Sequence, residues 1–315
     1  MAFANKVAQK VPPHAWFGVS AIFHYLGPSF AVLLFPAVGV LGVAWMRIAS
    51  AALIFLPWTK PWETFKNADG KTRLLLVGLG VCLAVMNTAF YLALDRLPMS
   101  LVAAVEFVGT VALAAYGLRT RRNFLALFFS VIGVLILIDV KWGTDPIGLF
   151  WAFLNGLLFV GYIVLGHRAA EGGAGGGIER LGAAMAIALI FLMPIGFLQA
   201  ASAFGSYKLV LAGIGVGVCS SVIPYVCDQL AMSRLPRASF ALLLALLPAS
   251  ATIIAALVLS QIPSAKDIGG ILLVMIGIAI HKPKETKAKP TNRTVNETQN
   301  ADYVFANVTE KPRVE

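Results

Sequence analysis

Two opposite charges stand inside long apolar runs of this chain, where a charge is costly. Arg47 lies about ten residues into the run 37–57, and Glu106 about eight residues into the run 98–118. If both runs are helices, the rise of about 1.5 Å per residue puts both charges roughly 12–15 Å below the same face of a membrane. An ionised side chain at that depth costs about 2.5–3.5 kcal/mol on insertion scales, so its retention implies a partner or a function.

The matched depth of Arg47 and Glu106 allows two interpretations. They can meet as an ion pair that holds two helices together. Alternatively, they line a cavity and bind a zwitterion, with Arg47 against a carboxylate and Glu106 against an ammonium group. Glu106 is also a candidate proton acceptor, because a partly buried carboxylate binds a proton more readily than an exposed one.

Four further polar side chains lie in other apolar runs. His24 stands about ten residues into the first run, where it either bonds a backbone carbonyl or takes part in substrate binding. Asn87 and Tyr91 are four residues apart and so share one helical face; they either hydrogen-bond a substrate or hold helices together. Asp228 lies near one end of the eighth run, where it is either solvated or a proton-coupling carboxylate.

The reactive residue types are not spaced for catalysis or metal binding. The cysteines have no CxxC spacing and the histidines no HExxH pattern: Cys82, Cys219 and Cys227; His14, His24, His167 and His281. No GxxxxGK[ST] sequence occurs, so ATP is not the expected energy source. The pattern predicts no cofactor, no metal site and no enzymatic activity, with a membrane-embedded enzyme as a remote alternative.

The elements that carry these side chains are apolar enough to cross a membrane. Of 315 residues, 59% are hydrophobic and 13% charged, and the mean hydropathy is +0.82, whereas a soluble domain carries roughly 25% charged residues. Runs of about 17–22 residues match a hydrocarbon core of about 30 Å. They predict an all-α integral membrane protein with ten transmembrane helices, at about 14–35, 37–57, 73–94, 98–118, 122–139, 146–166, 181–200, 208–230, 237–259 and 265–281.

The net charge of +10 comes from basic residues between the runs, which indicate orientation rather than nucleic-acid binding. One alternating set of loops carries Lys60, Lys66, Lys71, Arg73, Arg119, Arg121, Arg122, Arg168, Arg180, Arg234 and Arg237. The opposite set carries only Arg96, Lys141, Lys208 and Lys266. By the positive-inside rule the first set, and with it both termini, is cytoplasmic. Five helices per half then make the second half inverted relative to the first.

An internal repeat supports this division. The sequence GVC at 80–82 and RLP at 96–98 recurs as GVC at 217–219 and RLP at 234–236. The shift from Gly80 to Gly217 is too long a period for a solenoid and fits a membrane protein of two similar halves. We expect a five-helix repeat over 1–140, a second over 141–281, and a disordered cytoplasmic tail over 282–315.

Glycines and prolines predict where helices approach or loosen. Five glycines are expected to allow close helix contacts: Gly78, Gly80, Gly213, Gly215 and Gly217. Three prolines are expected to free backbone carbonyls toward a cavity: Pro28, Pro224 and Pro248. The glycine-rich stretch 171–177 predicts a flexible loop.

Three short motifs of the chain are informative when they are taken together. FPAVG at 35–39 is followed by Met46-Arg47, Glu106-Phe107 comes eight residues after Leu97-Pro98, and YVCDQLAMSRLP occupies 225–236. Together with the ten runs, they resemble the drug/metabolite transporter superfamily with its EamA-type repeats, and more narrowly the threonine/homoserine exporters. The likeness covers 14–281, and Asp228 stands where that family carries an acidic residue. The chain departs from the family at Gly109-Thr110, in place of Gly-Pro, at Leu247 before Pro248, in place of an acidic residue, and at Ser260-Gln261, in place of Gly-Glu.

The resemblance implies a secondary-active exporter in the inner or plasma membrane. Its expected substrate is a small amphipathic metabolite, most simply an amino acid such as threonine or homoserine, moved by alternating access. Export of drugs or other metabolites is the alternative. The implied partners are a small-molecule substrate, the lipid bilayer and protons as the coupling ion, with no nucleic acid; the oligomeric state stays open.

Overall fold

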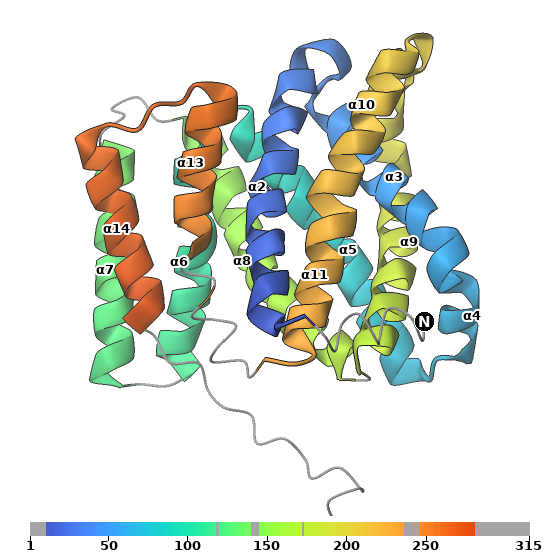
Figure 1. Ribbon diagram of the computed structural model, residues 1–315, viewed down its shortest axis with the longest axis horizontal. Helices are drawn as coiled ribbons and strands as arrows, with labels where there is room; N and C mark the ends of the chain where they lie inside the picture. The colour runs from blue at the N-terminus through green and yellow to red at the C-terminus, as the bar shows by residue number, and fades with distance from the viewer. Residues whose placement is uncertain are drawn as a thin grey trace, which may run out of the picture. The chain divides into compact units, whose positions relative to one another are not determined.

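Helices make up all the regular structure of the described chain (Figure 1). The computed structural model describes residues 11–117, 120–139, 145–171, 173–235, 243 and 246–280. The predicted tail over 282–315 lies outside these residues. The all-helical prediction is confirmed for the described part.

The helices follow the apolar runs closely. Those before residue 140 are α2 (Pro13–Val38), α3 (Val40–Thr59), α4 (Pro61–Asn67), α5 (Gly70–Leu94), α6 (Met99–Gly117) and α7 (Arg121–Asp139). Those after it are α8 (Pro146–Ala170), α9 (Gly173–Ala200), the 3₁₀ turn η1 (Ala201–Gly205), α10 (Tyr207–Gly217), the π-helical turn η2 (Val218–Val222), α11 (Ile223–Met232), α13 (Leu247–Leu259) and α14 (Ala265–Ile280).

Each predicted run contains a helix, but not every helix is long enough to count as a span by itself. Six described helices are long and apolar enough to cross a membrane: Pro13–Val38, Val40–Thr59, Gly70–Leu94, Pro146–Ala170, Gly176–Gly205 and Tyr207–Met232. Shorter apolar helices cover Met99–Gly109 and Leu247–Leu259. The count of ten spans therefore stays a prediction.

Two features of the helices differ from the sequence-based expectation. The short helix α4 begins at Pro61, where the missing N–H of proline costs nothing. The loop expected over 171–177 is wrong in its second part, because α9 already begins at Gly173. Gly177 shows why glycine suits a helix here: a Cβ at this position would lie 2.6 Å from Gln229 Oε1 and 3.3 Å from Ala170 Cα.

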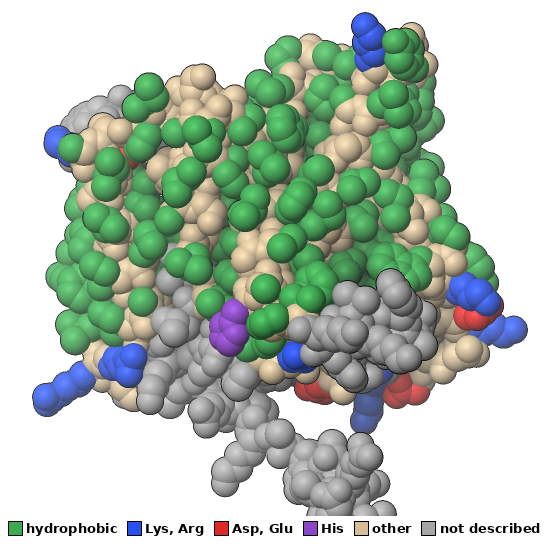
Figure 2. Space-filling model, in the orientation of Figure 1, with side chains coloured by type: hydrophobic (Ala, Val, Ile, Leu, Met, Phe, Trp, Pro, Cys, Tyr) green, Lys and Arg blue, Asp and Glu red, His purple; other side chains and the backbone are tan. Residues whose placement is uncertain are grey.

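The outer surface of the bundle is apolar and the charges lie at its ends. Figure 2 shows hydrophobic side chains over the sides of the helices, and Lys and Arg side chains mainly along the lower edge. Leu198 is 82% exposed, Leu257 79% and Ile190 74%. Apolar side chains exposed on this scale require a lipid rather than a water environment.

Helices from the two halves of the sequence pack pairwise. α2 lies against α11, α3 against α9, α5 against α8, α6 against α13, and α7 against α14. Glycines permit the closest of these approaches. A Cβ on Gly133 of α7 would lie 2.5 Å from the Gly270 carbonyl of α14, and a Cβ on Gly270 would lie 2.9 Å from the Gly133 carbonyl.

Both ends of the described chain lie at one end of the bundle. Arg234, after α11, donates from Nη1 to the Val11 carbonyl at 2.8 Å, and Arg122, at the start of α7, donates from Nε to the Ile280 carbonyl at 2.5 Å. The two arginines belong to the loops predicted to share a side with the termini. The two contacts agree with the prediction that these loops and the ends of the described chain share one side of the membrane. Which side is cytoplasmic stays a prediction.

Candidate functional site

Arg47 is buried in the middle of α3 and is fixed by the π-helical turn η2. Its Nε donates to Ser221 Oγ at 2.9 Å and its Nη2 to the Ser220 carbonyl at 2.7 Å. Nη2 also reaches the Tyr225 hydroxyl at 3.4 Å. The guanidinium carbon lies 5.3 Å from the centre of the Tyr91 ring, a cation–π distance.

The Ser220 carbonyl is free to accept because of the proline four residues later. In a regular α-helix this carbonyl would accept from the N–H of residue 224, and Pro224 has none. The preceding turn is π-helical, with the Ile223 N–H bonded to the Val218 carbonyl. For Pro224 the prediction of a freed carbonyl is therefore confirmed, and that carbonyl is occupied by Arg47.

Glycines bring two neighbouring helices onto η2. A Cβ on Gly217 would lie 1.7 Å from Ser50 Oγ and 2.8 Å from the Arg47 carbonyl, so α3 passes close against the start of the turn. A Cβ on Gly27 of α2 would lie 2.3 Å from Ser220 Oγ. The close contacts predicted for Gly80, Gly213 and Gly217 are confirmed, whereas Gly215 has no atom within 4 Å and Gly78 only an ordinary contact.

Glu106 and His24 form the opposite pole of the site. The carboxylate is 2% exposed, and His24 Nε2 lies 4.0 Å from its Oε1, an ion pair only when the imidazole carries a proton. His24 therefore faces a carboxylate rather than a backbone carbonyl. Asn155 of α8 also lies beside Glu106. Gly156 permits this close approach of α8, since a Cβ added to Gly156 would lie only 3.2 Å from Glu106 Cα.

The direct ion pair between Arg47 and Glu106, which was one of the two interpretations of these charges, is not formed. Glu106 pairs with His24 instead, and other ion pairs among the described residues join Lys60 with Glu63 and Arg96 with Asp145. Arg47 remains close enough to interact electrostatically with both Glu106 and His24. Its hydrogen bonds go to η2 instead, so the two charges share one interior without neutralising each other by contact.

Asn87 and Tyr91 both face this interior from α5. Asn87 Nδ2 donates to the Leu83 carbonyl of its own helix at 2.6 Å, and its Oδ1 accepts from the Tyr225 hydroxyl at 3.2 Å. Asn87 thus joins α5 to α11, which fits the interpretation as a helix link. The Tyr91 ring packs under Arg47 and its hydroxyl has no partner in the described part of the chain.

Asp228 lies inside the bundle, so the interpretation as a solvated carboxylate is wrong. It is 6% exposed. Ser20 Oγ donates to its Oδ1 at 2.6 Å, and the Tyr162 hydroxyl donates to its Oδ2 at 3.3 Å. A cavity of about 10 Å³, enough for about one water, is lined by both Asp228 and His24.

Several buried polar atoms in this interior have no hydrogen-bond partner in the described part of the chain. Within the described residues they include Tyr25 Oη, Arg47 Nη1, Tyr91 Oη, Glu106 Oε2, Asn155 Nδ2 and Ser220 Oγ. Most buried polar groups in folded proteins are satisfied, and each exception needs an explanation. These atoms come from six different elements, α2, α3, α5, α6, α8 and η2, which points to one common site for a polar ligand.

Several residues of this site escaped the sequence analysis. Asn155 and the pair Ser220-Ser221 were detectable, because they are polar residues inside apolar runs and the serines precede Pro224. Tyr25 and Tyr225 were not, since a tyrosine in a membrane helix is common. No group of three or more metal-ligating side chains occurs among residues with a described position.

Comparison with known proteins agrees with this architecture. The sequence model of the EamA-like transporter family matches residues 146–281. The chain is 32% identical over 270 residues to the threonine/homoserine exporter RhtA of Escherichia coli strain K12, covering 84% of this chain and 90% of that one. It is 33% identical over 230 residues to RhtA of Salmonella typhimurium strain SL1344, covering 72% and 76%.

Solved structures also share the fold, and one crystal structure is representative. It superposes with a TM-score of 0.58 at 17% sequence identity, over 84% of this chain and 94% of the other. These findings, with the apolar helices, define a multi-pass membrane transporter of the drug/metabolite transporter superfamily. The chain belongs to the EamA-like transporter family within it and is similar to threonine/homoserine exporters of bacteria.

Proposed function

We propose that this protein is a secondary-active exporter of small amphipathic metabolites, with amino acids such as threonine or homoserine as its main substrates. Its relatives of known name are threonine/homoserine exporters. Membership of a transporter family supports export rather than enzymatic activity.

The observation that carries the proposal is the separation of Arg47 and Glu106. Both are buried, they carry opposite charges, and each keeps one unpaired polar atom, Nη1 and Oε2. A free amino acid supplies the missing partners at once, because its carboxylate can accept from Arg47 and its ammonium can donate to Glu106. Charge-assisted hydrogen bonds of this kind are about twice as strong as neutral ones.

The neighbouring groups suit the rest of such a ligand. His24 and Asn155 lie beside the Glu106 carboxylate, and the hydroxyls of Tyr25 and Tyr91 have no partner in the described chain. A hydroxyl on the substrate side chain, as in threonine, would find donors and acceptors here. A purely apolar side chain would leave these hydroxyls unsatisfied, which costs about 1–3 kcal/mol for each buried group.

The burial of the site supports transport by alternating access. Arg47, Glu106 and Asn87 are each 2–3% exposed, so a substrate reaches them only if helices move apart. We propose that ten helices in two inverted five-helix repeats, 1–140 and 141–281, perform this movement, with the site between the halves. The pairing of helices across the halves supports the division.

Proton coupling is assigned to the carboxylates Glu106 and Asp228. Both are inside the bundle, and neither is paired with a fixed cation in the described chain. A proton on Glu106 would remove the charge that holds a substrate ammonium, so protonation and substrate binding compete. Ser20 and Tyr162 stabilise the ionised form of Asp228 by donating hydrogen bonds to it.

Counterflow in proteoliposomes tests the substrate class. Vesicles preloaded with unlabelled threonine should take up labelled threonine and homoserine. Amines that lack a carboxylate and acids that lack an amine should compete poorly, because each satisfies one pole only. Strong competition by apolar drugs, with none by amino acids, would instead assign the protein to drug efflux.

A further inference from the structure

A groove of about 830 Å³ opens between α5, α8 and α9 at the end of the bundle where basic residues gather. Among its described lining residues are three cations, Lys71, Arg168 and Arg180, and one carboxylate, Glu171. Lys71 and Arg168 are exposed, and neither belongs to an ion pair of the described chain. Arg180 is anchored by donation from Nη1 to the Ala169 carbonyl at 2.9 Å. The groove therefore holds positive charge that the described residues do not neutralise.

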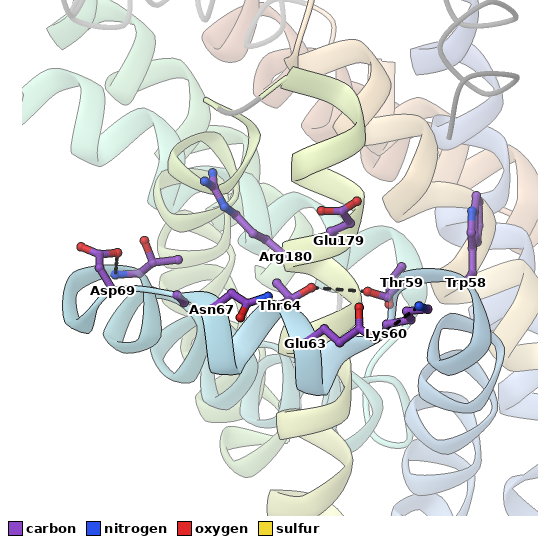
Figure 3. A pocket seen from close by; sticks show the side chains of 11 residues that line it. Trp58, Thr59, Lys60, Glu63, Thr64, Asn67, Asp69, Glu179 and Arg180 are labelled. Atoms are coloured by element: carbon purple, nitrogen blue, oxygen red, sulfur yellow. Dashed lines mark hydrogen bonds and ion pairs between the residues drawn. The ribbon is translucent and has the colours of Figure 1, made fainter.

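The pocket next to this groove has a different character. It has a volume of about 700 Å³, shares Arg180 with the groove, and is built on α4 and α9 (Figure 3). Its carboxylates are Glu63, Asp69 and Glu179, against the cations Lys60 and Arg180. Lys60 is already paired with Glu63 at 3.2 Å. This pocket has no excess of positive charge, so the attraction for an anion is specific to the groove.

The groove also has an apolar wall. Lys71, Leu74 and Gly78 share one face of α5, since they are three and seven residues apart. Leu74 is 74% exposed, and Leu165 of α8 forms the facing wall. Gly78 leaves the floor open: a Cβ there would meet only Leu165 Cδ1, at 3.9 Å. The lining of the groove thus combines cations with an apolar wall formed by Leu74, Gly78 and Leu165.

We propose that this groove binds an anionic phospholipid. Its phosphate lies among Lys71, Arg168 and Arg180, and an acyl chain follows Leu74 and Gly78. Basic pockets between membrane helices at the headgroup level bind anionic lipids through this combination of charge and apolar contact. A soluble anion would satisfy the cations but would leave the apolar wall uncovered. The inference is independent of the transported substrate.

Native mass spectrometry of the purified protein tests the proposal. The detergent-solubilised protein is titrated with phosphatidylglycerol and, separately, with phosphatidylcholine. Wild type should retain phosphatidylglycerol preferentially. The double variant Lys71→Gln with Arg168→Gln should bind it about 25-fold more weakly, since each cation contributes about a fivefold factor. Arg121→Gln, an exposed cation at the start of α7 outside the groove, should bind as wild type does.

A second variant separates a lipid from a soluble anion. Gly78→Leu fills the apolar floor without changing any charge, so it should weaken phosphatidylglycerol binding while thermal stability in phosphatidylcholine stays normal. Inorganic phosphate at millimolar concentration should compete poorly. Equal retention of the two lipids by wild type would overturn the proposal. Full competition by phosphate, together with normal lipid binding by Gly78→Leu, would replace the lipid with a soluble anion.

Discussion

The Arg47 guanidinium is hydrogen-bonded through two of its nitrogens and unpaired at the third. This difference distinguishes a binding role from a purely structural one. Its Nε and Nη2 are committed to the serines of η2, while Nη1 has no partner in the described chain. A purely structural arginine would be expected to use all of its donors. A binding arginine keeps one edge available for an oxyanion.

Exchanging the two buried charges tests this distinction. Arg47→Gln and Glu106→Gln should each reduce transport at least a hundredfold, because each removes one pole of the site. The double exchange Arg47→Glu with Glu106→Arg should not restore activity, since a substrate in its original orientation would face like charges at both ends. Transport into inverted vesicles, normalised to the amount of inserted protein, is the measurement. Substantial recovery in the double exchange would instead assign the pair a structural role.

Outside the membrane helices, Asp145 supports a pH prediction. It caps the start of α8 by accepting from the Ile147 N–H at 2.8 Å, and it pairs with Arg96. The hydrogen bond from Arg96 lowers the pKa of Asp145 below its usual value of 3.8. A lowered pKa means that the stabilisation is present at neutral pH and lost as pH falls through the lowered pKa.

Asp145→Asn should therefore lower the melting temperature of the purified protein slightly at pH 7. The difference from wild type should shrink as the pH falls below about 4, where the wild-type carboxylate itself becomes protonated. The effect is small because the pair is exposed. A difference that stays constant down to pH 3 would mean that the ionised carboxylate does not contribute through this pair.

The sequence could indicate the charged members of the site but not their partners. Arg47, Glu106 and His24 were visible because a charge in an apolar run is costly. That His24 contacts Glu106, and that Arg47 contacts Ser220 and not Glu106, depends on the rotation of each helix. Depth along a helix can be counted from residue number, whereas rotation is set by packing against neighbours.

At the scale of elements, η2 is the irregular segment on which the site depends. Gly217 lets α3 pass so close that Arg47 reaches the carbonyl freed by Pro224. π-Helical turns inside α-helices occur frequently at functional sites. Freed carbonyls at mid-membrane are tolerated where the protein itself satisfies them, as Arg47 does here.

A pair of glycines two residues apart tests the importance of this contact. Gly217→Ala places a Cβ 1.7 Å from Ser50 Oγ and 2.8 Å from the Arg47 carbonyl. It should destabilise the protein by about 1–3 kcal/mol, as overpacking does, and reduce transport. Gly215→Ala meets no atom within 4 Å and should be neutral or slightly stabilising, since alanine favours a helix. The measurements are thermal unfolding and counterflow on both variants. Equal stability and equal transport of the two variants would contradict the close packing of α3 on η2.

Helix positions were predictable because apolar length is a strong signal, but helix ends and irregular turns were not. Glycine is a poor helix former, which predicts a loop at Gly173, yet tertiary packing around Gly177 favours glycine in α9. The π turn has no sequence signal of its own beyond Pro224. The helix α4 is too short to produce a clear apolar period.

At the scale of the whole molecule, equivalent glycines make equivalent contacts in the two halves of the sequence. A Cβ on Gly80 would meet the Ala184 carbonyl and Ile187, and a Cβ on Gly217 would meet the Arg47 carbonyl and Ser50. Gly217 follows Gly80 by a certain number of residues. Ala184 follows Arg47, and Ile187 follows Ser50, by this same offset in the sequence. Gly133 and Gly270, which touch each other, are separated by this offset too. The packing therefore repeats with the period of the sequence motifs.

The chemistry does not repeat in the same way. Arg47 corresponds to Ala184 at this offset, and Asp228 corresponds to Tyr91. The charged groups of the central site thus lie in the first half only, while the half that matches the family model carries Asp228. In the mechanism that we propose, two similar scaffolds with different polar residues would let the halves move as equivalent bodies while the substrate and proton groups remain distinct.

The orientation of this arrangement can be measured directly. Lys66 and Thr120 are exposed at loops predicted to be cytoplasmic, and Lys208 and Lys266 are exposed at loops predicted to lie opposite. In a background without the three native cysteines, single cysteines at Lys66 and Thr120 should react with a membrane-impermeant reagent only in inverted vesicles. Cysteines at Lys208 and Lys266 should react only in intact cells. Arg122, two residues after Thr120, donates to the Ile280 carbonyl, so the end of α14 is expected on the side of Thr120. The inverted repeat requires Lys66 and Lys208 to lie on opposite sides of the membrane. If both react from the same side, the second half is not inverted relative to the first, and the two repeats would have to be parallel.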